Sequence, residues 1–90
     1  MKKPMKQSEA RIIIYLNNAE SRMKYARQIS YKLQIDYAYL LGRLREMKEK
    51  LWIQPVRRGN KVFYELTGSA PLSLSLAIMK EKSNEGIIQL

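Results

Sequence analysis

The segment from Tyr25 to Thr67 contains two helical patterns followed by a strand-turn-strand pattern, and this order constrains the fold more than any other feature. In the first pattern, the spacing of Ala26, Ile29 and Leu33 places three apolar residues on one face of a helix. The second pattern contains Leu40, Leu44, Met47 and Leu51, spaced to form one narrow apolar stripe. Two helices that each carry one apolar face predict a shared core.

The residues between these two helices favour a tight turn. Asp36 precedes the second helix, where its carboxylate can accept hydrogen bonds from free backbone N–H groups as an N-cap. Ile35 and Leu40 occupy the two positions of a hydrophobic staple. We therefore expect the angle between the two helices to be fixed at this corner.

A β-hairpin is predicted after the second helix, with Gly59 and Asn60 as its two-residue turn. This turn predicts five cross-strand pairs, which are Arg57 with Val62, Val56 with Phe63, Pro55 with Tyr64, Gln54 with Glu65, and Ile53 with Leu66. Ile53 and Leu66 then lie on the inner face. Val56 and Phe63 lie on the outer face, where covering them requires the last helix, Trp52 or a second subunit.

The motifs that carry a resemblance are the "ARQIS" start of the first helix, the LxxLRxMxxK run of the second, the hairpin "WIQPVRRGNKVFYELT" and the Leu66-Thr67 step into a last helix. In these motifs the chain resembles the winged helix-turn-helix of small bacterial and archaeal transcription regulators, the broad group that includes the MarR-like and ArsR-like families. The resemblance implies an α+β, mainly α fold with three core helices, a β-hairpin wing and a C-terminal helix. It also implies DNA binding.

The charge of the chain agrees with a polyanionic partner. The sequence has 17 basic and 8 acidic residues in 90, and between Arg22 and Lys61 the count is eleven basic against three acidic. Stabilising surface ion-pair networks need both signs of charge, so this excess favours nucleic-acid contact over a merely solvated surface. Charge alone does not distinguish DNA from RNA.

Catalysis and metal binding are poorly supported, because the sequence has neither cysteine nor histidine. Asp36 is explained as a cap, and no other acid is paired with a base at a useful spacing, so we expect no enzyme and no cofactor. No apolar stretch of signal-peptide or membrane-span length follows the basic start, so we expect a cytoplasmic protein without a membrane partner. With no room for an effector domain, no small-molecule ligand is expected.

Three parts are expected along the chain. Residues 1–7 form a flexible basic N-terminus, residues 8–67 the winged domain, and residues 68–90 a C-terminal helix and tail. The first helix is expected from Ser8, its N-cap, to Ala19, with Glu9 in its first turn and Ala10 facing away from the core.

Two shorter features complete the expected fold. Residues 22–24 are expected to form a short third strand. The last helix is expected to start near Pro71 and to end at Asn84 and Gly86. Surplus apolar residues on the first and last helices predict a dimer interface formed by Ile14, Leu72, Leu76 and Met79.

By resemblance, the exposed face of the second motif helix reads DNA through Tyr37, Ala38, Leu41, Gly42 and Arg45, and Tyr39 can bond phosphate or base. Phosphate contacts are expected from Lys24, Tyr25 and Arg27 at the start of the supporting helix and from Arg57, Arg58, Asn60 and Lys61 at the wing tip. Arg45 is the one evident bidentate donor toward guanine, so base readout should be limited.

The leading functional hypothesis is a homodimeric DNA-binding transcription regulator, a repressor with low sequence stringency. The helix would enter the major groove of double-stranded DNA, and the basic wing would contact the minor groove or its phosphates. The alternative is a winged-helix adaptor for protein-protein interaction, since Ala38, Leu41 and Gly42 could pack on another helix.

Overall fold

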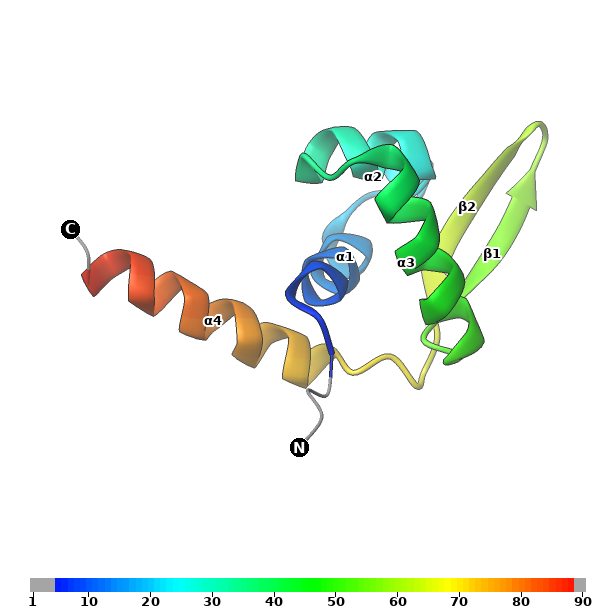
Figure 1. Ribbon diagram of the computed structural model, residues 1–90. Helices are drawn as coiled ribbons and strands as arrows, with labels where there is room; N and C mark the ends of the chain where they lie inside the picture. Colours follow the sequence, from blue (N-terminus) through cyan, green and yellow to red (C-terminus); the bar gives the residue numbers. More distant parts are fainter. Residues whose placement is uncertain (1–4, 89–90) are drawn as a thin grey trace.

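The computed structural model of the chain describes residues 5–88, and the side chains of residues 5–80. In chain order the elements are α1 (Gln7–Asn18), the 3-10 helix η1 (Ser21–Met23), α2 (Ala26–Leu33), α3 (Tyr37–Glu49), β1 (Ile53–Arg58), β2 (Lys61–Leu66) and α4 (Leu72–Ile88). Figure 1 shows α1 at the centre, with α2, α3 and the hairpin beside it and α4 leading away from the body. The predicted order of helices and hairpin is confirmed.

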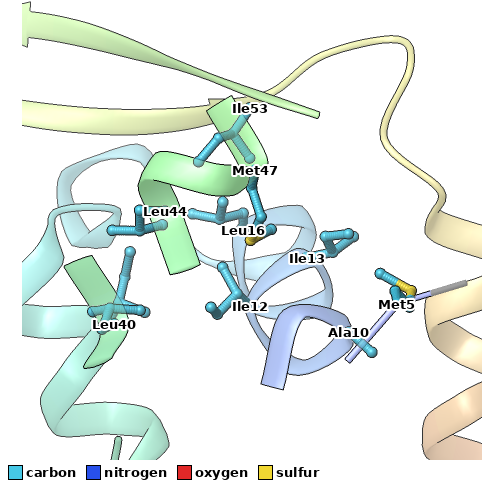
Figure 2. Close-up of a cluster of buried hydrophobic side chains, with 10 residues drawn as sticks. Met5, Ala10, Ile12, Ile13, Leu16, Leu40, Leu44, Met47 and Ile53 are labelled. Atoms are coloured by element: carbon cyan, nitrogen blue, oxygen red, sulfur yellow. The ribbon is translucent and has the colours of Figure 1, made fainter. Parts of the chain in front are cut away.

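The core is formed where α1, α2 and α3 meet under the base of the hairpin. Its buried aliphatic residues are Ile12, Ile13, Leu16, Ile29, Leu40, Leu44, Met47 and Ile53, each at most 2% exposed. Figure 2 shows most of these side chains converging between α1 and α3. Full burial of one such side chain contributes about 1.5–3 kcal/mol, so this cluster dominates the stability of the fold. The predicted apolar face of α3 is confirmed for Leu40, Leu44 and Met47.

The end of α3 differs from the predicted stripe. Leu51 is 68% exposed and holds a left-handed backbone conformation with φ of 65°. The backbone N–H of Trp52 donates to the carbonyl of Met47 at 3.0 Å, and that of Leu51 donates to the carbonyl of Lys48 at 2.9 Å. This pair of bonds is a Schellman motif, which normally has glycine at the position of Leu51. The prediction that Leu51 lies in the core is therefore wrong.

The start of α1 also differs from the prediction. The backbone N–H of Lys6, not the side chain of Ser8, takes part in the cap, because Glu9 Oε1 accepts from it at 3.0 Å. Met5 is buried and Gln7 begins the helix, so ordered structure starts before the expected boundary at residue 8; residues 1–4 lie outside the described residues. Ala10 is buried as well, which overturns its predicted outward direction.

The segment before α2 is not a strand. Residues 21–23 form η1, and the only bridge to the hairpin found among the described residues outside β1 and β2 joins Tyr25 to Phe63. The backbone N–H of Tyr64 donates to the carbonyl of Lys24 at 2.9 Å. The predicted strand at residues 22–24 is therefore reduced to one point of attachment between the wing and the body.

The corner between α2 and α3 is as predicted. The backbone N–H of Tyr39 donates to Asp36 Oδ2 at 3.1 Å, which confirms Asp36 as the N-cap. Gln34 turns the chain with φ of 58°, and the Ser30 hydroxyl donates to the carbonyl of Ile35 at 2.6 Å. These local bonds set the relative orientation of the two helices.

The hairpin has the predicted register throughout, from Ile53 opposite Leu66 to Arg57 opposite Val62. Gly59 takes the positive φ of 60° that the two-residue turn requires. On the outer face, the ring of Phe63 meets the ring of Tyr25 edge to face at 5.9 Å. Tyr25 therefore contributes to the cover of Phe63, a contact that the sequence did not predict; the cover of Val56 stays a prediction.

Helix α4 packs against α1 along its first turns. Ser75 is fully buried there, donating from its hydroxyl to the carbonyl of Pro71 at 2.8 Å and lying 3.6 Å from the sulfur of Met5. The helix continues past the predicted end at Asn84 and Gly86 to Ile88. Among the described residues, no helix combines the length and hydropathy needed to span a bilayer.

Candidate nucleic-acid interface

The exposed face of α3 is opposite its buried stripe, and it carries small and basic residues. Ala38 and Arg45 are exposed, and Gly42 lies between them. A Cβ atom placed on Gly42 would meet nothing within 4 Å, so the helix backbone is open at this point. A partner can therefore approach the backbone of α3 closely.

A hollow of about 600 Å³ lies between the starts of α2 and α3 and strand β2; we call it the tyrosine hollow. Its lining residues are Tyr25, Ala26, Arg27, Tyr37, Leu41, Lys61, Val62 and Tyr64. Two cations stand over aromatic rings at its rim. The Arg27 guanidinium carbon lies 4.4 Å from the ring centre of Tyr37, and Lys61 Nζ lies 4.1 Å from that of Tyr25.

The chemistry of the tyrosine hollow suits a sugar-phosphate backbone. Tyr25 occupies the N-cap position of α2 without a side-chain hydrogen bond to the helix, so backbone N–H groups of the first turn are left for an anion. Burial, and next the neighbouring Tyr37, raise the pKa of Tyr64, whose hydroxyl can act as a donor. Arg27 and Lys61 add positive charge.

A second hollow, of about 250 Å³, lies on the other side of Leu41, between α3 and β1. It is lined by Leu41, Leu44, Arg45, Lys48, Pro55 and Tyr64. Lys48 is absent from the predicted site, although its position one helical turn after Arg45 could have indicated it. Both hollows lie along the edge of α3 that faces the hairpin, and they share Leu41 and Tyr64.

The wing carries fewer free cations than expected. Glu65 lies 3.3 Å from Lys24 Nζ and 3.4 Å from Arg58 Nη2, and the Arg58 guanidinium also stacks 5.4 Å from the ring centre of Phe63. Arg57 is exposed, and within the described side chains it has no acid within ion-pair distance. The same holds, in this part of the chain, for Arg27, Arg45, Lys48 and Lys61.

Tyr39 is not grouped with the other predicted contacts. Its hydroxyl lies 3.2 Å from the Ser8 hydroxyl, and the Arg43 guanidinium carbon lies 5.5 Å from its ring centre. Arg43 in turn donates to Glu46 at 2.9 Å, which raises the pKa of Arg43 and lowers that of Glu46. Tyr39 therefore lies on the edge of α3 that faces α1.

The four residues predicted at a dimer interface are placed unequally. Ile14, Leu72 and Met79 are half-buried within the chain, and Leu76 is 51% exposed. Ile14 and Met79 also line a mainly apolar hollow of about 650 Å³ between α1, η1, α2 and α4. Tyr15, in the same hollow, donates to the carbonyl of Met23 at 2.8 Å, and burial raises its pKa.

The described part of the chain contains no candidate metal-binding site. No group of three or more potential ligands is gathered among these residues. The candidate site is a basic surface built from α2, α3 and the wing.

No family model and no curated protein matches this sequence. Solved structures do match. In a DNA complex of MepR from Staphylococcus aureus, 96% of this chain superimposes on 66% of that chain, with a TM-score of 0.81 and 18% sequence identity. In a DNA complex of ZitR from Lactococcus lactis, 99% of this chain superimposes on 62% of that chain, with a TM-score of 0.74 and 19% sequence identity.

MepR is described as a transcription regulator of the multidrug efflux pump MepA, and that structure has a TM-score of 0.75. These likenesses confirm the predicted winged helix-turn-helix fold. The chain spans about two thirds of the length of the structures it matches.

Proposed function

We propose that this protein is a DNA-binding transcription regulator whose α3 enters the major groove while the wing contacts the adjacent minor groove or its phosphates. The observation that carries the proposal is the pair of hollows beside the exposed face of α3. Both contain cations, Arg27 and Lys61 in one and Arg45 and Lys48 in the other, without an acid partner among the described side chains. Such cations are available to neutralise phosphates.

Sequence readout is limited to a few groups. Arg45 can donate two hydrogen bonds to guanine, and Leu41 can contact a thymine methyl group. Ala38 and Gly42 have no side-chain donor, but they allow the helix to lie deep in the groove. Phosphate contacts therefore supply most of the affinity, and sequence stringency is low.

The regulator acts as a homodimer in the cytoplasm and represses by occupying promoter DNA. Two copies related by two-fold symmetry present two α3 helices to half-sites about one helical turn apart. Leu76, together with Ile14, Leu72 and Met79, supplies the apolar contact. MepR and ZitR, which have the same fold, have both been solved with DNA.

A gel-shift titration of random duplex DNA across a salt series tests the proposal. If about six cations per subunit contact phosphates, log affinity falls with log salt at about −0.9 per contact. Arg57→Ala should weaken binding to every duplex alike. Arg45→Ala should also reduce the preference among sequences. A protein-interaction adaptor would bind without this steep slope, and that result would reject the proposal.

A second candidate is a regulator that responds to an apolar or aromatic ligand, favoured by the 650 Å³ hollow between α1, η1, α2 and α4. MepR has also been solved bound to ethidium bromide. A thermal-shift assay with ethidium in the absence of DNA tests this candidate. A rise in melting temperature that Met79→Lys abolishes would support it, and no rise at saturating ethidium would remove it.

A further inference from the structure

Glu9 is a buried carboxylate on α1 that joins this helix to α3. About 1% of its surface is exposed. Its Oε1 accepts the backbone N–H of Lys6, while its Oε2 lies 3.2 Å from Arg43 Nη1 and 3.7 Å from Lys50 Nζ. Arg43 belongs to α3 and Lys50 is its C-cap. The carboxylate of Glu9 therefore contacts α3, the helix proposed to read DNA, at two points that lie two turns apart.

The neighbouring residue adds a third link. The Ser8 hydroxyl lies 3.2 Å from the hydroxyl of Tyr39, in the first turn of α3. Tyr39, Arg43 and Lys50 follow one another at steps of four and seven residues, so they share one edge of the helix. The first turn of α1 therefore contacts α3 near its beginning, its middle and its end.

These polar contacts constrain the orientation of α3 relative to α1 in a way that the apolar core does not. Where α1 meets α3, the other contacts are aliphatic, from residues such as Ile12, Leu16 and Leu44, and apolar contacts allow one helix to rotate or slide against another. A buried ion pair adds little stability over an apolar pair of similar volume. The Nε atom of Arg43 is also buried without a hydrogen-bond partner, which lowers the stability of the fold. Stability alone therefore does not explain this arrangement.

The side chain of Arg43 is directed away from the DNA-reading face. At 100° per residue, Arg43 and Arg45 project about 160° apart around α3. Arg43 is 13% exposed, held between the carboxylates of Glu9 and Glu46. It therefore adds to the basic count of the motif without being available to phosphate.

We propose that Glu9 is a positioning residue for DNA reading, one that fixes the rotation of α3 about its axis and keeps Arg43 turned toward α1. This inference rests on the proposed function. Sequence preference depends on the orientation of the few groups that reach base edges, whereas phosphate contacts tolerate rotation. Loss of the Glu9 charge should therefore reduce selectivity more than affinity.

The test compares wild type with Glu9→Gln on two duplexes by fluorescence anisotropy. One duplex is selected by the wild-type protein from a random pool, and the other is an unrelated duplex of equal length. We expect the ratio of the two affinities to fall about tenfold, the size of one lost base-pair discrimination. Affinity for the unrelated duplex should stay the same or rise, because Arg43 and Lys50 lose a buried counter-charge.

Two variants serve as controls. Glu46→Gln removes the exposed carboxylate from the same arginine but leaves the link to α1, so the ratio should stay within about twofold of wild type. Adding Arg43→Gln to Glu9→Gln should cause no further loss of selectivity if Glu9 acts through Arg43. Equal weakening on both duplexes, or the same loss from Glu46→Gln, would overturn the inference.

A measurement without DNA separates this inference from the proposed function. Amide hydrogen exchange in Glu9→Gln should become faster in α3 and remain unchanged in the hairpin. If the wild-type protein binds no duplex, the proposed function fails. The exchange measurement still decides whether Glu9 positions α3, because unchanged exchange in α3 of Glu9→Gln would overturn this inference. Should Glu9→Gln not fold, Glu9→Met removes the charge with an apolar side chain that the core can accommodate.

Discussion

At the scale of single residues, Leu51 holds a backbone conformation that costs free energy in any residue with a Cβ atom. Its φ is 65°, and the residue is 68% exposed, so packing of its side chain contributes little free energy to offset this strain. We expect Leu51→Gly to raise the free energy of unfolding by about 1 kcal/mol, because glycine adopts this conformation without steric conflict. Urea denaturation with a constant m-value measures the change.

The matched control is the preceding residue, Lys50, whose φ of −79° is ordinary for any residue. Lys50→Gly should lower the stability, since it adds freedom to the unfolded chain and removes the contact with Glu9. If both variants are destabilised alike, the left-handed conformation of Leu51 does not carry the strain assigned to it.

Residue-level predictions were correct where the determining contacts are local. Asp36 is an N-cap because its carboxylate and the Tyr39 N–H are three residues apart. The predicted Ser8 cap was wrong because the helix begins at Gln7, with Lys6 as its N-cap and Glu9 accepting from the Lys6 N–H. The inward contact of Glu9 with Arg43 is one that no local pattern indicates. Leu51 fits the apolar spacing of α3, but the helix ends two residues before it.

At the scale of elements, the wing is held to the body by Glu65 as well as by backbone bonds. Glu65 forms ion pairs with Lys24 and Arg58, two of the cations expected to contact phosphate. We expect Glu65→Gln to raise affinity for random duplex severalfold and to steepen the salt dependence, because two cations are released. Anisotropy titrations at several salt concentrations measure both quantities.

The control for this prediction is Glu20→Gln, which frees Arg22 in a pair that is exposed on both sides and belongs to neither hollow of the candidate site. It changes the net charge equally, so it should give a smaller gain in affinity. Equal gains from the two variants would show that net charge, rather than the position of the released cations, controls binding.

The hairpin was predictable as an element, and its attachment was not. Turn type and apolar alternation set the register from Ile53 to Leu66 within one short segment. The cover of Phe63 comes from Tyr25, which is remote in sequence and had been assigned to phosphate binding. The tyrosine hollow also depends on this tertiary contact, so only its separate residues could be named in advance.

At the scale of the whole molecule, α4 contacts the body through α1 and carries exposed apolar residues beside that contact. Leu74 and Leu76 are 36% and 51% exposed. If the proposed homodimer forms through this face, Leu76→Glu should produce a monomer and lower DNA affinity by at least about tenfold, since avidity from the second half-site is lost. Sedimentation equilibrium and anisotropy measure the two effects.

Tyr31→Glu provides the comparison, because Tyr31 on α2 is 73% exposed and belongs to no proposed interface. It should leave both the oligomeric state and the affinity near wild type. A dimer that persists in Leu76→Glu would place the subunit contact elsewhere.

The arrangement of whole elements was predictable only in part. Ala10 on α1 was predicted to face away from the core, yet it is buried, and α4 of the same chain packs against this helix. Helical periodicity identifies apolar faces but not the element that packs on each. Charge showed the same limit, because Arg43, Lys24 and Arg58 are neutralised by acids distant in sequence.

The empty space above Gly42 bears on how such a protein can change its target. A Cβ atom added there meets no neighbouring atom within 4 Å, and Ala38 beside it is exposed. Replacement of a helical glycine even adds about 1 kcal/mol of stability. If α3 reads DNA as proposed, these two positions lack any side-chain donor, and substitutions there could change sequence preference without repacking the core.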